Sequence, residues 1–65
     1  MTSYYVVDAP GYHGDWVRVY RVCRTLEAAR KYIGRETMFG VVAAPTGSYA
    51  KREMISRAVS LSYVR

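Results

Sequence analysis

Several residue types that would define a chemistry are scarce in this sequence. Cysteine and histidine occur once each, as Cys23 and His13. A single cysteine cannot form an internal disulfide, and these two residues do not supply the roughly four ligands of a structural zinc site. No apolar run of about 18 residues is present, which argues against a transmembrane helix. Residues 1–4 lack the basic and apolar regions of a signal peptide, so we expect a cytoplasmic protein with a reduced thiol.

Catalytic arrangements are also missing. Cys23 and His13 would be separated by roughly 20 Å if the residues between them form a strand, which is too far for a nucleophile and its base. His13 with the nearby carboxylates Asp8 and Asp15 is a weak metal-binding pattern in a loop. The stretch around Gly47 and Ser48 lacks the spacing of a phosphate-binding loop. Only five acidic residues are scattered along the chain, so we predict no enzyme, no metal and no cofactor.

The chain has 65 residues, which is enough for one domain spanning residues 1–65. A chain this short buries only about 60% of its unfolded surface. Because disulfides and metals are ruled out as aids, homodimerisation or docking on a partner remains. Apolar residues make up 51% of the sequence, which indicates a globular chain rather than a disordered one.

Arginine and tyrosine are abundant in the sequence, whereas acidic residues are scarce. Ten basic residues against five acidic ones give a net charge of +5, and seven residues are tyrosine. Eight of the ten bases are arginine, which makes bidentate contacts to phosphate and carboxylate and stacks on aromatic rings. Both residue types are enriched at interfaces. The composition therefore favours a binding surface for nucleic acid or an acidic protein over a basic charge that only maintains solubility.

Two strands and a helix are predicted in the first half. Residues 4–7 are β-branched and aromatic, and a loop of about seven residues joins them to a second strand at Trp16–Cys23, forming an antiparallel hairpin. In the second strand we expect Val17, Val19 and Cys23 to face the helix, because side chains alternate along a strand. Trp16, Arg18, Tyr20 and Val22 would then face the other way.

The helix is predicted over residues 25–33. Thr25 is a suitable N-cap, Glu27 lies in the first turn, and Gly34 follows as the C-cap. Leu26, Ala29 and Ile33 share one face. A helix of this length is unstable alone and must pack on the sheet.

The second half is less regular. Residues 37–44 are apolar throughout, which predicts a central strand, and Gly40 inside it indicates a bulge or close packing. Residues 49–56 fit either a short helix or a basic loop. Residues 59–63 alternate as a half-buried strand does, although a helix through this stretch is the alternative. The predicted fold class is α+β, a small antiparallel or mixed sheet of about four strands (β-β-α-β-β) with one helix covering one face.

The uncovered face of that sheet would present aromatic and basic side chains to a partner. Basic and aromatic residues at period two can follow phosphates while rings stack on bases, although RNA-recognition and helix-turn-helix motifs are absent. The alternatives are a solvated face or a dimer interface. The predicted partner-binding residues are Tyr12, His13, Trp16, Arg18, Tyr20, Arg21 and Arg24. A second basic patch is formed by Lys51, Arg52 and Arg57, with a solvated charge cluster as its simplest interpretation.

The hairpin, helix and strand layout, with residues 4–7 followed by residues 24–34, resembles that of small accessory proteins of bacteriophages and other mobile elements. Anti-CRISPR and other anti-defence inhibitors belong to that group. The resemblance implies a non-enzymatic inhibitor that binds a host protein or nucleoprotein complex in the host cytoplasm, with no membrane involvement. Many such inhibitors are acidic DNA mimics, whereas this chain is basic. A small nucleic-acid-binding regulator and a homo-oligomeric structural protein are the alternatives.

Overall fold

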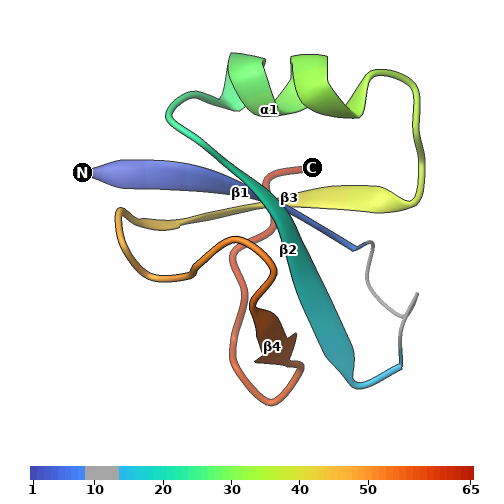
Figure 1. Ribbon diagram of the computed structural model, residues 1–65, viewed down its shortest axis with the longest axis vertical. Helices are drawn as coiled ribbons and strands as arrows, with labels where there is room; N and C mark the ends of the chain where they lie inside the picture. The colour runs from blue at the N-terminus through green and yellow to red at the C-terminus, as the bar shows by residue number, and fades with distance from the viewer. Residues whose placement is uncertain (9–13) are drawn as a thin grey trace.

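The computed structural model describes residues 1–8 and 14–65 (Figure 1). Its helix and strands follow in the order β1 (Thr2–Asp8), β2 (Trp16–Cys23), α1 (Leu26–Ile33), β3 (Phe39–Pro45) and β4 (Met54–Ser56). The bounds of β2 coincide with those predicted, and α1 differs only at its first residue, which is the cap. Tyr12 and His13, predicted to contact a partner, lie outside the described residues.

The four strands form one antiparallel sheet in the order β3-β1-β2-β4, which confirms the α+β class. The prediction that residues 37–44 form a central strand is wrong, because β1 and β2 occupy the centre. The outer edge of β3 is instead lined by the C-terminal segment, residues 62–65. The Val41 N–H donates to the Arg65 carbonyl at 3.2 Å, and the Val64 N–H donates to the Val41 carbonyl at 2.8 Å. An apolar strand can therefore lie at the end of the four-strand order and still have both edges bonded.

The helix α1 begins and ends as its caps predict. The Thr25 hydroxyl accepts a hydrogen bond from the Ala28 N–H at 3.1 Å, which satisfies one of the free amides of the first turn. Gly34 takes the left-handed φ of 62°, and its N–H donates to the Arg30 carbonyl. The buried residues Ala29 and Ile33 attach α1 to the sheet.

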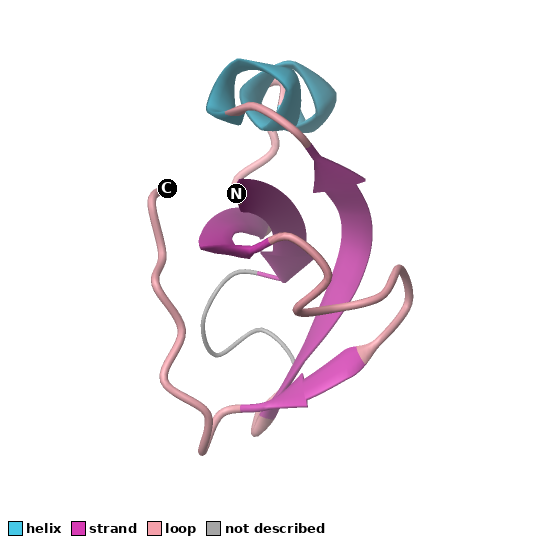
Figure 2. Ribbon diagram, turned by 90° about the vertical axis from the view of Figure 1, so that its left-hand side faces the viewer, coloured by secondary structure: helices cyan, strands magenta, loops and turns pink. Residues whose placement is uncertain are grey.

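Both faces of the sheet are covered, which contradicts the prediction of one open face. On the α1 side, Val6, Cys23 and Val41 pack with the helix residues Ala29 and Ile33. The opposite face contains a second buried cluster, Tyr5, Val7, Val17, Val19, Val42 and Ile55. Side chains from the C-terminal third, Tyr49, Leu61 and Tyr63, pack against that cluster. Figure 2 shows α1 at one end and the C-terminal segment running along another side of the curled sheet.

A bulge in β2 changes which residues face the helix. Val6 pairs with Arg21 and Val7 pairs with Val19, so Tyr20 is an extra residue without a partner position on β1. Before the bulge, Val17 and Val19 lie on the face opposite α1; after it, Cys23 lies on the α1 side. The prediction that all three face the helix is therefore wrong for the two valines, because strict alternation assumes an unbroken strand.

The chain after β3 also differs from the prediction. The fourth strand is Met54–Ser56, and residues 59–63 form neither a named strand nor a helix, with Tyr63 alone making a bridge to Val42. This segment crosses the sheet to cover its second core. Gly40 allows that approach, because a Cβ at Gly40 would lie 3.2 Å from the Tyr63 ring. Residues 49–53, left open between helix and loop, contain no helix and make a turn at Lys51 and Arg52. Over the described ranges, no helix has the length and apolarity to cross a membrane.

Candidate interface along strand β2

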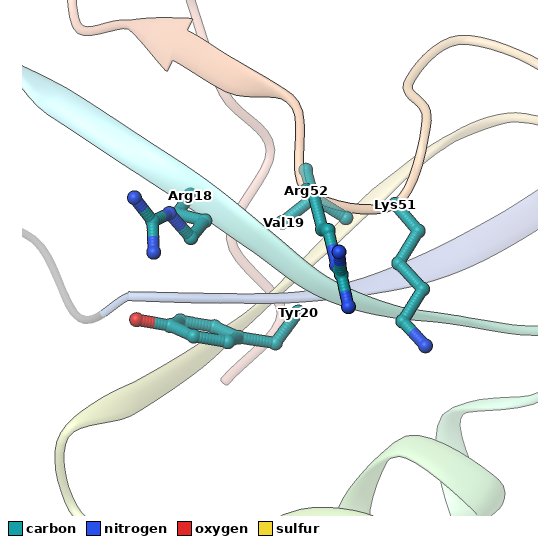
Figure 3. Close-up of a pocket in the computed structure, with 5 residues that line it drawn as sticks. All are labelled: Arg18, Val19, Tyr20, Lys51 and Arg52. Atoms are coloured by element: carbon teal, nitrogen blue, oxygen red, sulfur yellow. The ribbon is translucent and has the colours of Figure 1, made fainter.

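A cavity of about 460 Å³ on the outer side of β2 brings the two predicted basic patches together. Arg18 and Tyr20 from β2 line it with Lys51 and Arg52 from the turn before β4 (Figure 3). The turn is held there by two backbone hydrogen bonds to Val19. The Arg52 N–H donates to the Val19 carbonyl at 2.8 Å, and the Val19 N–H donates to the Glu53 carbonyl at 2.9 Å. Figure 3 shows the Lys51 and Arg52 side chains extending across β2 in roughly the same direction.

The cavity contains cations and no carboxylate. The nearest acid in sequence, Glu53, does not line the cavity, and its Oε1 accepts a hydrogen bond from the Ala50 N–H at 3.1 Å. Arg18 donates from Nε to the sulfur of Met54 at 3.4 Å, which positions its guanidinium without neutralising it. Arg52 adopts a left-handed φ of 71°, a conformation that costs about 1 kcal/mol or more for a residue with a Cβ. The strained backbone position in this turn is therefore the residue whose guanidinium lines the cavity.

Tyr20 has both a structural and a surface position. Its half-buried ring packs edge-on against Phe39, with the centroids 5.1 Å apart, and the side chain also lines the cavity. The prediction that Tyr20 lies on a fully open face is therefore wrong. Packing against Phe39 therefore orients the ring that forms the aromatic wall of the cavity.

The bulge creates a second basic hollow between β2 and α1. Because Tyr20 is an extra residue, Arg21 also lies toward the helix, and its guanidinium stacks over the Tyr32 ring at 5.0 Å from the centroid. Arg21, Arg24 and the helix residue Lys31 line this hollow, whose volume is about 540 Å³. Lys31 and Tyr32 were not among the predicted contacts. The sequence does carry a signal for a basic hollow here. Ala28 and Lys31 lie one turn apart in a helix that begins just after Arg24, so a small and a basic side chain share the helix side near that arginine.

Trp16 lies at the other end of β2, opposite Ser56 of β4. Its side chain is 48% exposed. Its neighbour Val17 belongs to the core on the far side of the sheet, so Trp16 and Arg18 share the α1 side. The helix packs on β1, β2 and β3 but not on β4, which leaves this end of the face uncovered. The predicted basic and aromatic stripe therefore lies beside the helix, on the same face, rather than on a face of its own.

Arg57 does not join Lys51 and Arg52. Its Nη1 donates to the Gly14 carbonyl at 3.0 Å, and its N–H donates to the Asp15 carbonyl at 2.8 Å. It lines a different hollow together with Tyr63. The second basic patch proposed from sequence is therefore divided, with Arg57 bound to the start of β2.

The described residues include no cluster of three metal-ligating side chains. Cys23 is a buried free thiol. The buried Asp8 accepts a hydrogen bond from the Arg18 N–H at 3.2 Å, which ties the end of β1 to β2 at a residue that lines the cavity. Asp8 thus acts as a structural acceptor at the start of the basic region.

Together these features describe a small α+β protein with a basic region along the central strand β2 that consists of two neighbouring hollows. We call this region the basic surface and define it as Arg18, Arg21, Arg24, Lys31, Lys51 and Arg52. In comparisons with known proteins, no family model, no curated protein and no solved structure matches the chain.

Proposed function

We propose that this chain is a non-enzymatic binding protein that docks on a larger, negatively charged partner through the basic surface. The observation that carries the proposal is the convergence of Arg18, Lys51 and Arg52 on one cavity that no acidic side chain lines. Like charges held close together repel, and an anionic partner relieves that repulsion while speeding association.

The aromatic neighbours support docking rather than simple solvation. Interface energy concentrates in aromatic and arginine side chains that become desolvated on binding. Trp16 is half-exposed beside Arg18, and Tyr32 is held under Arg21. If the chain is akin to the accessory proteins of bacteriophages that its layout resembles, the partner is a host protein or nucleoprotein complex. Its positive charge then implies contact with an acidic or phosphate-bearing site, not imitation of DNA.

A matched pair of charge reversals tests the proposal. The double variant Arg18→Glu with Lys51→Glu alters the cavity, whereas Arg30→Glu with Arg35→Glu alters two exposed arginines outside every cavity described above. Both change the net charge equally. On immobilised heparin, used as a general polyanion, we expect the cavity variant to elute at much lower salt than the control variant. Equal elution of the two would show that only net charge matters and would overturn the proposal.

Trp16 gives a second test of the same surface. Because its side chain is half-exposed, Trp16→Ala should weaken heparin or partner binding about tenfold or more while the chain still folds, which thermal denaturation checks. Tyr20→Ala is a poorer test, because it also removes the ring that packs on Phe39. Tyr20→Phe keeps that packing and isolates the hydroxyl. Unchanged binding in Trp16→Ala would remove this residue from the interface.

Nucleic-acid binding is the second candidate function, favoured by Trp16 and Tyr20 lying among cations on one face. Rings can stack on bases while arginine and lysine contact phosphates. For single strands, log affinity should fall by about 0.7 per log unit of salt for each phosphate neutralised. A gel shift with single-stranded oligonucleotides at two salt concentrations measures this slope. Absence of a shift at both would leave an acidic protein as the partner.

Self-association is less well suited to the basic surface. A two-fold dimer formed there would place Arg18, Lys51 and Arg52 near their own copies, which is repulsive. Light scattering measures the oligomeric state directly. If the chain is a dimer, we expect the dimer interface to lie outside the basic surface, and we expect heparin binding to be unaffected.

A further inference from the structure

The outer edge of β2 is bonded along only part of its length. Pairing with β4 covers Trp16, Val17 and Arg18, and the two bonds to the turn reach Val19. Within residues 1–8 and 14–65, no strand pairs with this edge from Arg21 onward. The opposite edge of the sheet, along β3, is occupied by the C-terminal segment. The last residues of β2 thus form a strand edge that neither β4 nor its turn covers.

The bulge determines which backbone groups face that edge. The carbonyl of Asp15 and both backbone groups of Val19 point toward β4 and its turn, so every second residue is directed outward. The extra residue Tyr20 delays the next outward position by one. Val22 therefore carries the outward N–H and C=O, and its side chain is 43% exposed. An edge of this kind readily pairs with another extended chain.

Hollows lie on both sides of the same edge. The basic hollow of about 540 Å³ lies on the α1 side, and another of about 500 Å³ lies on the side of Met1, Ser3 and Thr46. The two share Val22, Cys23 and Arg24. Side chains of an added strand alternate between the two faces of a sheet. An added strand would therefore place every second side chain in the basic hollow on the α1 side, which favours acidic residues. Its other side chains would enter the second hollow, which favours small or apolar residues.

We propose that the partner contributes an extended acidic segment that adds to β2 as a strand beside Val22. Its main chain would bond to the outward groups of Val22, and its carboxylates would enter the α1-side hollow toward Arg21, Arg24 and Lys31. This inference rests on the proposed function and specifies how the anionic partner is recognised. It follows a known mode of peptide recognition, in which main-chain bonds provide affinity and alternate side chains provide specificity.

Charge decides between this occupant and a second copy of the chain. Pairing two β2 edges would bring the Arg21 and Arg24 side chains of both copies close together at one short contact, and like charges held close together destabilise a strand pair. An acidic strand instead places opposite charges across the same contact. The open edge spans about four residues, roughly 13 Å, so the segment would be short and the rest of the basic surface would add to its affinity.

The experiment uses a fluorescent peptide of alternating glutamate and valine and two isomers of equal charge, measured by fluorescence anisotropy on the whole chain. One isomer is N-methylated at every valine and the other at every glutamate. In an added strand, one set of amides faces β2 and the other faces away. All strand pairs in this sheet are antiparallel, so we expect methylation at valine to weaken binding about tenfold or more and methylation at glutamate to have little effect. Equal binding of both isomers would overturn strand addition.

Charge variants distinguish a failure of strand addition from a failure of the proposed function. Arg21→Glu with Arg24→Glu should weaken the parent peptide about tenfold, whereas Arg30→Glu with Arg35→Glu should not; melting temperatures confirm that both variants fold. If charge reversal weakens binding but both methylated isomers bind alike, docking by charge stands and strand addition fails. If the parent peptide does not bind while heparin binding still depends on Arg18 and Lys51, strand addition again fails alone. If neither ligand depends on these cations, the proposed function fails with it.

Discussion

Tyr63 illustrates how a single side chain connects the C-terminal segment to the rest of the molecule. It packs on the second core, bridges to Val42, and lies against the space that Gly40 leaves open. Burial raises the pKa of the Tyr63 phenol above its usual 10.0; Arg57 opposes this shift and Asp8 adds to it. The folded chain therefore holds this proton more tightly than the unfolded chain does.

This shift predicts a loss of stability at high pH. The contribution of neutral Tyr63 is complete below the unfolded pKa and disappears as the pH rises through the higher folded pKa. We expect the free energy of unfolding, measured by urea denaturation, to fall above about pH 10. Tyr63→Phe should flatten that decline, while Tyr32→Phe, at an exposed tyrosine, should not. An unchanged slope in Tyr63→Phe would show that other groups cause the decline.

At the scale of elements, α1 joins the hydrophobic core to the proposed interface. Its buried side, Ala29 and Ile33, packs on the sheet, while Lys31 and Tyr32 border the basic hollow. The helix has only eight residues, too few to be stable without tertiary contacts. Its caps therefore matter both to stability and to the shape of the hollow.

Removing the N-cap tests this dependence. Thr25→Ala leaves the Ala28 N–H without its side-chain acceptor and should lower the free energy of unfolding by about 1 kcal/mol. Thr25→Ser retains the acceptor and should be close to the parent chain. Chemical denaturation of the three proteins measures the difference. Equal stability of Thr25→Ala and the parent would mean that water replaces the cap without cost.

At the scale of the whole molecule, the C-terminal segment has two tasks. It bonds to the outer edge of β3, and through Leu61 and Tyr63 it covers the core on the face opposite α1. A single helix could not shield both faces of the sheet, and the segment supplies the second layer without regular secondary structure of its own. These bonds make the outer edge of β3 unavailable for intermolecular pairing, whereas the last residues of β2 stay accessible to it.

Deleting residues 62–65 should therefore open the β3 edge. We expect a lower melting temperature, since Tyr63 no longer packs on the core, and association that increases with protein concentration, since an unpaired edge strand is exposed. Val64→Pro is the milder control, because it removes only the Val64 N–H bond to Val41 and its side chain is largely exposed. Light scattering and thermal denaturation measure both effects. A truncated chain as stable and monomeric as the parent would contradict this account.

Local chemistry was enough to determine the helix with its caps, the bounds of β2 and the α+β class. Hydroxyl capping at Thr25, a left-handed glycine at Gly34 and β-branched runs act over a few residues, and their effect is visible in the sequence. The basic character of the surface was also set by composition, because ten cations against five acids must leave positive charge exposed.

Only tertiary structure decided where those charges gather and which faces are covered. The bulge at Tyr20 depends on how β1 pairs with β2, and it reverses the side assignment of the valines while turning Arg21 toward α1. Arg18 lies beside Lys51 and Arg52 because their turn, more than thirty residues later in the chain, forms backbone hydrogen bonds with Val19. Such contacts arise from long-range pairing and packing, which short patterns in a sequence do not encode.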